Sequence, residues 1–257
     1  MAAKTPEQKG AVFLSGGMMA VIICIVILAI ALIALGMTQP ARQETAHGTT
    51  LVTQQPTVSV VKSARPTVDL YVMSFCPYGT QAETAMAPVV SLLGSQADFR
   101  IRYITTVSGS TPDSVQSLHG SAEAEEDLRQ ICISTYYPGQ FWSYLDAFNT
   151  RCFPSWQNAT VLSSCQEDTA TALSMNTTTI ESCATGSEGI ALLKADEAEA
   201  EKNQIRASPT VLINGVPYSG YRTPEAYKEA VCNAFETAPP ECSTVLSSSS
   251  GSAAGNC

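Results

Sequence analysis

A strand that leads directly into a cysteine and a proline constrains the fold of this chain more than any other feature. Residues 68–73 read VDLYVM, an aromatic and β-branched run that is typical of a buried strand. Cys76 follows, and Pro77 stands where a helix would begin, since the missing N–H of a proline costs nothing there. Residues 99–103 alternate in polarity and predict a second strand after the helix. This order places Cys76 at the N-terminus of a helix between two strands.

The rest of the folded part predicts an α/β domain with a mixed sheet. Residues 111–203 are rich in helical patterns and form an expected helical insertion. Residues 210–213 then read TVLI and lead into an Asn-Gly pair, a strong hairpin signal. A helix that starts with a proline ends the domain. The expected domain therefore spans residues 66–243, with the insertion at about 111–203.

A long uncharged run near the N-terminus predicts a membrane anchor. Residues 11–36 contain no charged side chain, and about 20 apolar residues suffice to span a bilayer as a helix. The run is longer than the apolar core of a cleavable signal peptide, so we expect a signal-anchor that stays attached. Lys4 and Lys9 precede it and favour a cytoplasmic N-terminus, residues 1–10. The sequence thus predicts a single-pass membrane protein, with a flexible linker at 37–65 and an extracytoplasmic main domain.

The cysteine content agrees with an oxidising compartment. The 257-residue chain has nine cysteines, of which Cys24 alone lies inside the apolar run. The others form no tight C-x2–4-C pairs, which indicates disulfides rather than a metal site. The net charge of −9 and the low content of charged residues, 14%, argue against a nucleic-acid partner, because phosphate binding needs clustered Lys and Arg. No cofactor is expected.

When Cys24, Cys76 and the terminal Cys257 are set aside, six cysteines remain, and they allow many pairings among which the sequence alone does not choose. Proximity along the chain favours Cys152–Cys165 and Cys232–Cys242, which leaves Cys132–Cys183. The last cysteine, Cys257, follows a serine- and glycine-rich stretch, so residues 244–257 predict a flexible tail with an unpaired, inert end. Asn158 and Asn176 begin N-x-T sequons and are candidate glycosylation sites.

Cys76, Pro77, Tyr78 and Gly79 form a C-P-Y-G motif, in which glycine replaces the second cysteine of a C-x-x-C redox pair. A thiol at a helix N-terminus faces free N–H groups and the positive end of the helix dipole, which favour the nucleophilic thiolate. Because Gly79 cannot resolve a mixed disulfide, three interpretations stay open. Cys76 works as a monothiol, or its thiol serves a partner enzyme, or the domain binds clients without turnover.

Residues 207–210, with the sequence ASPT, stand just before the expected hairpin and resemble the cis-proline loop of the thioredoxin fold. Together with the Cys76 motif, they make the domain similar to the bacterial DsbA group. The resemblance implies a cis Pro209 against Cys76, and a Ser208 backbone that pairs with a bound peptide. It also implies client proteins that carry thiols or disulfides, and a membrane oxidoreductase of the vitamin K epoxide reductase type as a partner.

The insertion resembles a second group, the gamma-interferon-inducible lysosomal thiol reductases. Residues 119–123 (HGSAE) and Cys132 keep the spacing of the signature CQHG-x2-EC-x2-N-x4-C, whereas other signature positions, including Ser117 and Asp127, depart from it. His119 is expected to cap or pack the helix rather than to act as a base. The last part of the domain is similar to the luminal thioredoxin-like segment of plant vacuolar sorting receptors, which bind peptides rather than perform redox chemistry.

These observations lead to one expected function and one alternative. We expect a membrane-anchored extracytoplasmic protein that uses the single Cys76 thiol for thiol-disulfide exchange, as a reductase or isomerase does. The alternative is a redox-inactive thioredoxin-like module that binds peptides or client proteins beside Pro209.

Overall fold

The computed structural model describes residues 60–257. The expected cytoplasmic segment, the membrane span and most of the linker fall within residues 1–59, outside the described part, so they stay predictions. Within residues 60–257, no helix is both long enough and apolar enough to cross a membrane.

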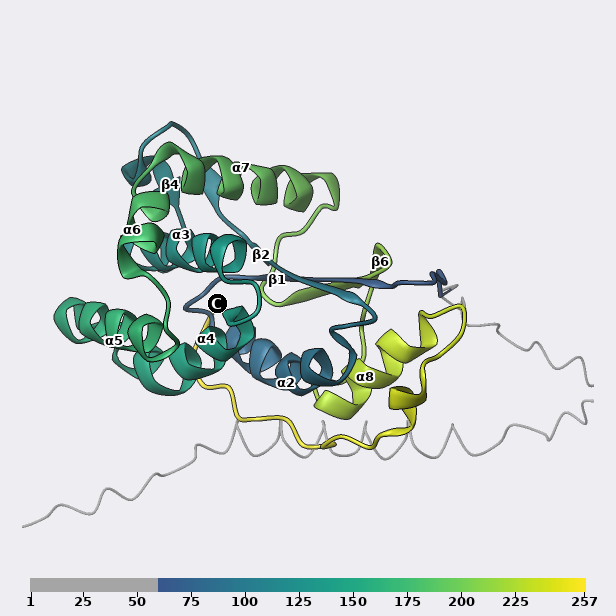
Figure 1. Ribbon diagram of the computed structural model, residues 1–257. Helices are drawn as coiled ribbons and strands as arrows, with labels where there is room; N and C mark the ends of the chain where they lie inside the picture. The colour runs from purple at the N-terminus through teal and green to yellow at the C-terminus, as the bar shows by residue number, and fades with distance from the viewer. Residues whose placement is uncertain (1–59) are drawn as a thin grey trace, which may run out of the picture. The chain divides into compact units, whose positions relative to one another are not determined.

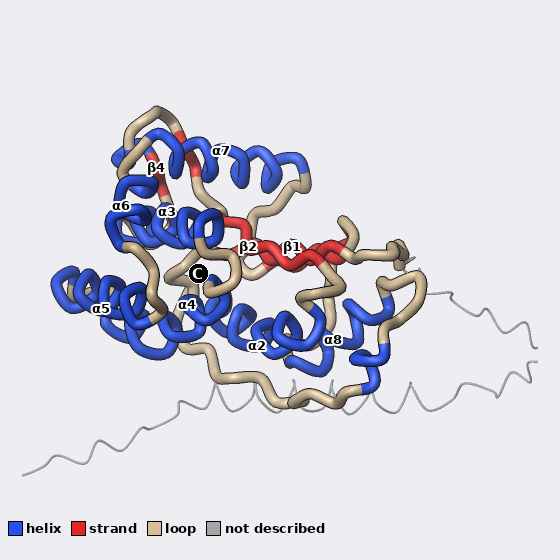
Figure 2. Tube along the Cα trace, viewed as in Figure 1, coloured by secondary structure: helices blue, strands red, loops and turns tan. Residues whose placement is uncertain are grey.

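A four-stranded mixed sheet forms the centre of the domain (Figure 2). Its strands lie in the order β2-β1-β5-β6 and span Asp98–Tyr103, Thr67–Val72, Thr210–Ile213 and Val216–Pro217, respectively. β1 pairs in parallel with β2 and antiparallel with β5, so that Leu70 lies opposite Ile101 on one side and Val211 on the other. β1 is therefore an inner strand, and the loop after it carries Cys76.

Helices cover both faces of this sheet (Figure 1). α2 (Pro77–Leu93) and α8 (Pro224–Asn233) lie together on one face, and α7 (Ser187–Lys202) lies on the other. Apolar side chains of α2, such as Met86 and Val89, are fully buried in the core. The strand-helix-strand unit and the terminal hairpin-helix unit that the sequence predicts are thus both present.

The insertion between β2 and β5 is mostly helical, as the sequence indicates. It begins with a short antiparallel hairpin and continues through four α-helices before α7. These elements span Thr106–Val107 (β3), Val115–Gln116 (β4), Ser121–Tyr136 (α3), Phe141–Ala147 (α4), Ala159–Ala172 (α5) and Thr177–Ala184 (α6). Because α3 packs against both α6 and α7, it forms the inner helix of the insertion.

Three disulfides fasten this architecture: two join the pairs that proximity favours, and the third joins the remaining pair. Cys132–Cys183 links α3 to α6, Cys152–Cys165 links the helical turn after α4 to α5, and Cys232–Cys242 links α8 to the short helix Pro240–Ser243. In each pair, both cysteines lie inside regular secondary structure. We call these three bonds the staples.

Both sequon asparagines are helix N-caps. The Asn158 side chain accepts a hydrogen bond from Val161 N at 3.2 Å, and the Asn176 side chain accepts one from Thr179 N at 3.2 Å. Both asparagines are exposed, and each cap uses Oδ1 rather than Nδ2, the atom to which a glycan would be attached. Glycosylation of these residues stays a prediction.

Candidate functional site

Cys76 is the N-cap residue of α2. Its backbone is extended, and its Sγ accepts a hydrogen bond from Gly79 N at 3.3 Å, so the sulfur takes up one of the free amides of the first turn. Pro77 follows at the first helical position, where a missing N–H costs nothing. The placement expected from the sequence is therefore present, with the Cys76 sulfur at the positive end of the helix dipole.

The loop that contains Pro209 lies against this sulfur. The Ser208–Pro209 peptide bond is cis, and Ser208 O is 3.5 Å from Cys76 Sγ. The Ser208 hydroxyl accepts a hydrogen bond from Met73 N at 3.0 Å, which ties the two loops together. A Cβ atom built on Gly79 would lie 2.9 Å from Ser208 Oγ, so the glycine of the motif stands where this hydroxyl leaves no room.

Cys76 is bonded to Cys257, the last residue of the chain, with 5.3 Å between the two Cα atoms. This corrects two expectations from the sequence: Cys257 is not unpaired, and Cys76 has a cysteine partner. The reason is that residues 244–257 run back along α2 to the site, so that 181 positions of chain separate two neighbouring residues (Figure 1). Serine- and glycine-rich composition predicts no such path.

Two buried carboxyl groups of α3 hold the loop before Cys76. Glu123 Oε1 accepts a hydrogen bond from Phe75 N at 2.8 Å, and Asp127 Oδ1 accepts one from Ser74 N at 3.2 Å. Burial, and then the neighbouring Glu123, raise the pKa of the Asp127 carboxyl well above its usual range. The insertion is therefore bonded directly to the backbone that positions the sulfur.

Residues 117–127, which the sequence analysis compared with a reductase signature, build this contact. His119 N donates to Glu123 Oε2 at 2.8 Å, and His119 Nδ1 lies 2.9 Å from Glu123 Oε1. Ser117, one of the departures from the signature, donates to Asp127, another departure, at 2.6 Å. His119 thus lies directly before Gly120, the N-cap residue of α3, and packs edge-on against Trp156 rather than capping the helix with its side chain. Its Nε2 also lies 3.3 Å from Asn256 O, which the sequence did not indicate.

Aromatic side chains stand on both sides of Cys76, one buried and one exposed. The Phe75 ring is buried among rings of the insertion, with its centroid 5.3 Å from that of Trp156 and 6.3 Å from that of Phe148. On the other side, the guanidinium of Arg222 lies 5.8 Å from the ring centroid of the exposed Tyr78. The motif is therefore held by the insertion through Phe75, whereas Tyr78 faces the surface.

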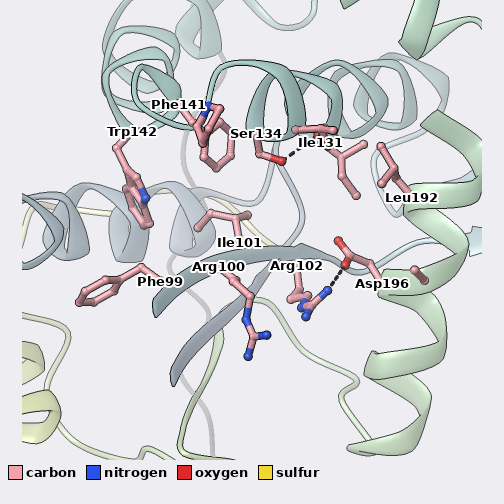
Figure 3. Close-up of a pocket in the computed structure, with 13 residues that line it drawn as sticks. Phe99, Arg100, Ile101, Arg102, Ile131, Ser134, Phe141, Trp142, Leu192 and Asp196 are labelled. Atoms are coloured by element: carbon pink, nitrogen blue, oxygen red, sulfur yellow. Dashed lines mark hydrogen bonds and ion pairs between the residues drawn. The ribbon is translucent and has the colours of Figure 1, made fainter. Parts of the chain in front are cut away.

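A separate pocket of about 300 Å³ lies beside the outer strand β2, away from the cysteine loop (Figure 3). Strand β2 contributes Phe99 and Ile101, and helix α4 contributes Trp142. An ion pair at 2.7 Å between Arg102 of β2 and Asp196 of α7 lines the side of the pocket next to α7. The pocket contains none of the residues that surround Cys76.

No three His, Cys, Asp or Glu side chains within residues 60–257 are grouped so that they could hold a metal ion.

The fold and the site together define a thioredoxin-like domain, with a cysteine at the start of α2, a cis-proline loop against it, and a helical insertion. A candidate protein disulfide isomerase from Nitrosomonas europaea matches with a TM-score of 0.51 at 12% identity, over 65% of this chain and 96% of that one. MdbA, a thiol-disulfide oxidoreductase from Actinomyces oris, matches with a TM-score of 0.52 at 13% identity, over 68% of this chain and 84% of that one. At such identities these likenesses show the fold alone.

Residues 100–232, more than half of the chain, match the family described as the vacuolar sorting receptor thioredoxin-like domain. The chain belongs to this family. No curated protein matches the sequence. The matched residues include the insertion and the Pro209 loop but neither Cys76 nor Cys257, so the family assignment does not extend to the two sulfur atoms of the site.

Proposed function

We propose that the protein is a membrane-anchored, extracytoplasmic thiol-disulfide exchange protein in which Cys76 forms the mixed disulfide with a client. The observation that carries this proposal is the position of Cys76 Sγ, which accepts the Gly79 N–H at the start of α2 and lies beside Ser208 O. An amide donor and a helix N-terminus stabilise a thiolate both as attacking group and as leaving group. The uncharged run at 11–36 supports the anchor.

Clients are expected to be proteins with exposed disulfides or thiols. The backbone of Ser208, next to the cis peptide bond, points an acceptor at the Cys76 sulfur, where an extended client segment could lie as an added strand. A membrane oxidoreductase remains our proposed partner for electron exchange.

The test is alkylation of Cys76 in the mildly reduced full-length protein across pH, read by peptide mass spectrometry. The ionisable side chains that contact the cysteine loop from neighbouring elements are Glu123, Asp127 and Arg222. We expect the helix amides to outweigh the carboxyl groups, since Asp127 is held toward its neutral form. The labelling midpoint should then lie below about 8.5, the value of an ordinary thiol. A midpoint at or above that value would contradict catalysis.

A second candidate function is client binding without turnover, which the family assignment favours. The pocket beside β2 offers a binding place for it other than the Pro209 loop that the sequence indicates. The family is defined on a receptor domain, and this pocket adds the apolar Phe99 and Trp142 to the surface near an outer strand. In that case, a Trp142→Ala variant should lose client binding while a Cys76→Ser variant retains it. Thiol exchange predicts the opposite order of the two effects.

A further inference from the structure

The C-terminal tail brings to the site the cysteine that the C-P-Y-G motif lacks. We propose that Cys257 is the resolving cysteine of Cys76, so that the chain carries a complete two-thiol redox centre with one thiol in the motif and the other on its last residue. This inference rests on the proposed function and states how a mixed disulfide at Cys76 is released. Its starting point is the bond between the two sulfurs beside Ser208 O.

The root of the tail is fixed to the start of α8. The buried Lys228 ammonium donates to Thr244 O at 2.6 Å, Leu246 N donates to Glu225 Oε2 at 2.6 Å, and Glu225 N donates to Ser247 O at 3.0 Å. The tail therefore leaves a fixed point, and only about ten residues separate Ser247 from the terminal cysteine. A tether of this length holds its end at an effective concentration of about the millimolar range.

The middle of the tail follows α2 and has one residue suited to close approach. Gln81 Nε2 donates to Gly251 O on the way. Gly255 has φ +134°, a conformation that side-chain-bearing residues rarely adopt, and a Cβ atom there would lie 2.7 Å from Pro77 Cγ. Glycine is thus required two residues before Cys257, directly over the proline of the motif.

The end of the tail is held by the same unit that holds the cysteine loop. His119 Nε2 lies 3.3 Å from Asn256 O, while Nδ1 of the same ring lies 2.9 Å from Glu123 Oε1. That carboxylate oxygen also accepts from Phe75 N at 2.8 Å. One histidine–glutamate pair therefore contacts the residue before Cys76 and the residue before Cys257, and it acts as a positioning pair for both sulfurs.

The proposed reaction starts from the reduced thiols of Cys76 and Cys257. The Cys76 thiolate attacks one sulfur of a client disulfide, forms a mixed disulfide, and expels the other client sulfur as a thiolate. The Cys257 thiolate then attacks Cys76 Sγ and expels the first client sulfur. Two electrons pass from the two thiols of the chain to the client disulfide, and the protons of the thiols go to the two client thiolates. The product is the Cys76–Cys257 disulfide seen in the structure.

The same product closes the site. With the tail in place Cys76 has no exposed surface, whereas Cys257 is exposed. A second thiol at position 79 could not fill the same role without displacing Ser208 Oγ, which would lie 2.9 Å from the new Cβ. The tail therefore supplies the resolving thiol from a direction that the motif leaves open.

A single-turnover experiment tests this assignment. Full-length protein, reduced only at the Cys76–Cys257 pair, is mixed with a slight excess of glutathione disulfide, quenched with acid and mapped by peptide mass spectrometry. In the wild type, glutathione on Cys76 should be transient and give way to the Cys76–Cys257 link. In Cys257→Ser, the adduct on Cys76 should form at a similar rate but persist at least tenfold longer.

A matched pair of glycine variants separates docking of the tail from the mere presence of a thiol. Gly255→Val should slow formation of the link at least tenfold, because its side chain meets Pro77. Gly251→Val lies on the same tail with nothing within 4 Å of its Cβ, so it should behave as the wild type. Equal rates in the two variants would contradict a seated tail.

The outcomes keep the two proposals apart. If the adduct on Cys76 forms but lasts as long in the wild type as in Cys257→Ser, Cys257 is not the resolving cysteine, and exchange at Cys76 stands. If no adduct forms on Cys76 in either protein, exchange at Cys76 itself is wrong. If Cys76→Ser acquires glutathione on Cys257 as fast as the wild type acquires it on Cys76, the two roles are reversed and the assignment fails.

Discussion

The staples and the Cys76–Cys257 bond are both disulfides, yet their surroundings differ. Each staple joins two regular elements. Of the six cysteines in the three staples, Cys132, Cys152 and Cys183 are almost fully buried. The fourth disulfide joins a helix N-cap to the exposed end of an irregular segment. The difference lies in what the bonds connect: each staple joins one regular element to another, whereas the fourth bond joins a helix N-terminus to a tethered cysteine, the arrangement on which the proposed exchange rests.

The largest effect should come from removing the staple with the longest enclosed loop. Cys132→Ala/Cys183→Ala opens a loop with a sequence separation of 51, and the chain-entropy model gives a loss of about 4 kcal/mol in the free energy of unfolding. Urea unfolding followed by circular dichroism measures it. As a control, Cys152→Ala/Cys165→Ala opens a separation of 13 and should cost about 3 kcal/mol. A loss below about 1 kcal/mol in both variants would contradict a stapling role.

A smaller effect is expected in the rates at which a mild reductant opens the Cys76–Cys257 bond and the staples. A mild dithiol reductant should open Cys76–Cys257 at least tenfold faster than any staple, because Cys257 is exposed and the Cys76 leaving group is stabilised by Gly79 N–H. Differential alkylation and peptide mass spectrometry give the four rates. If a staple such as Cys232–Cys242 opens as fast, the comparison between the two kinds of disulfide is broken.

The sequence predicted those parts of the molecule that depend on local signals. The strand before Cys76, the proline at the start of α2 and the Asn-Gly turn after β5 each specify their own backbone, and all three lie where expected. The carboxylate of Glu123 under Phe75 N is different, because it requires α3 to pack against a loop nearly fifty residues away in the chain. No local pattern reports such a tertiary contact.

The expectation of a loose, unpaired C-terminal tail failed because amino-acid composition does not report whether a segment lies against the rest of the protein. A Ser-, Gly- and Ala-rich stretch cannot build a core, which is why residues 244–257 predict a loose end. It can still lie against an existing surface if small residues permit close approach, as Gly255 does over Pro77. The number of cysteines after residue 36 is even, which could have indicated the bond, since the three staples leave Cys76 and Cys257 as the remaining pair.

The smallest predicted effect is a difference in pH response between the buried Glu83 of the core and the reduced Cys76 thiol. Burial raises the pKa of the Glu83 carboxyl to about 8, although a hydrogen bond from Asn149 opposes the shift and nearby Glu126 adds to it. Because this pKa lies above that of an exposed Glu, about 4.3, the folded state binds more protons than the unfolded state between those values. The contribution of Glu83 to the free energy of unfolding should therefore be greatest below about pH 4.5 and be lost as the pH rises toward 8.

Glu83→Gln tests this while keeping an acceptor for Asn149 Nδ2, which donates to Glu83 Oε2 at 2.6 Å. We expect the wild type to lose about 1 kcal/mol or more between pH 5 and pH 8 in urea unfolding, and the variant to lose less. An equal loss in both proteins would mean that Glu83 is not the group responsible. Over the same range, alkylation of the reduced Cys76 should become faster, because the thiolate fraction grows. Opposite responses to pH would show that the folded core and the tethered redox pair are governed by different ionisations.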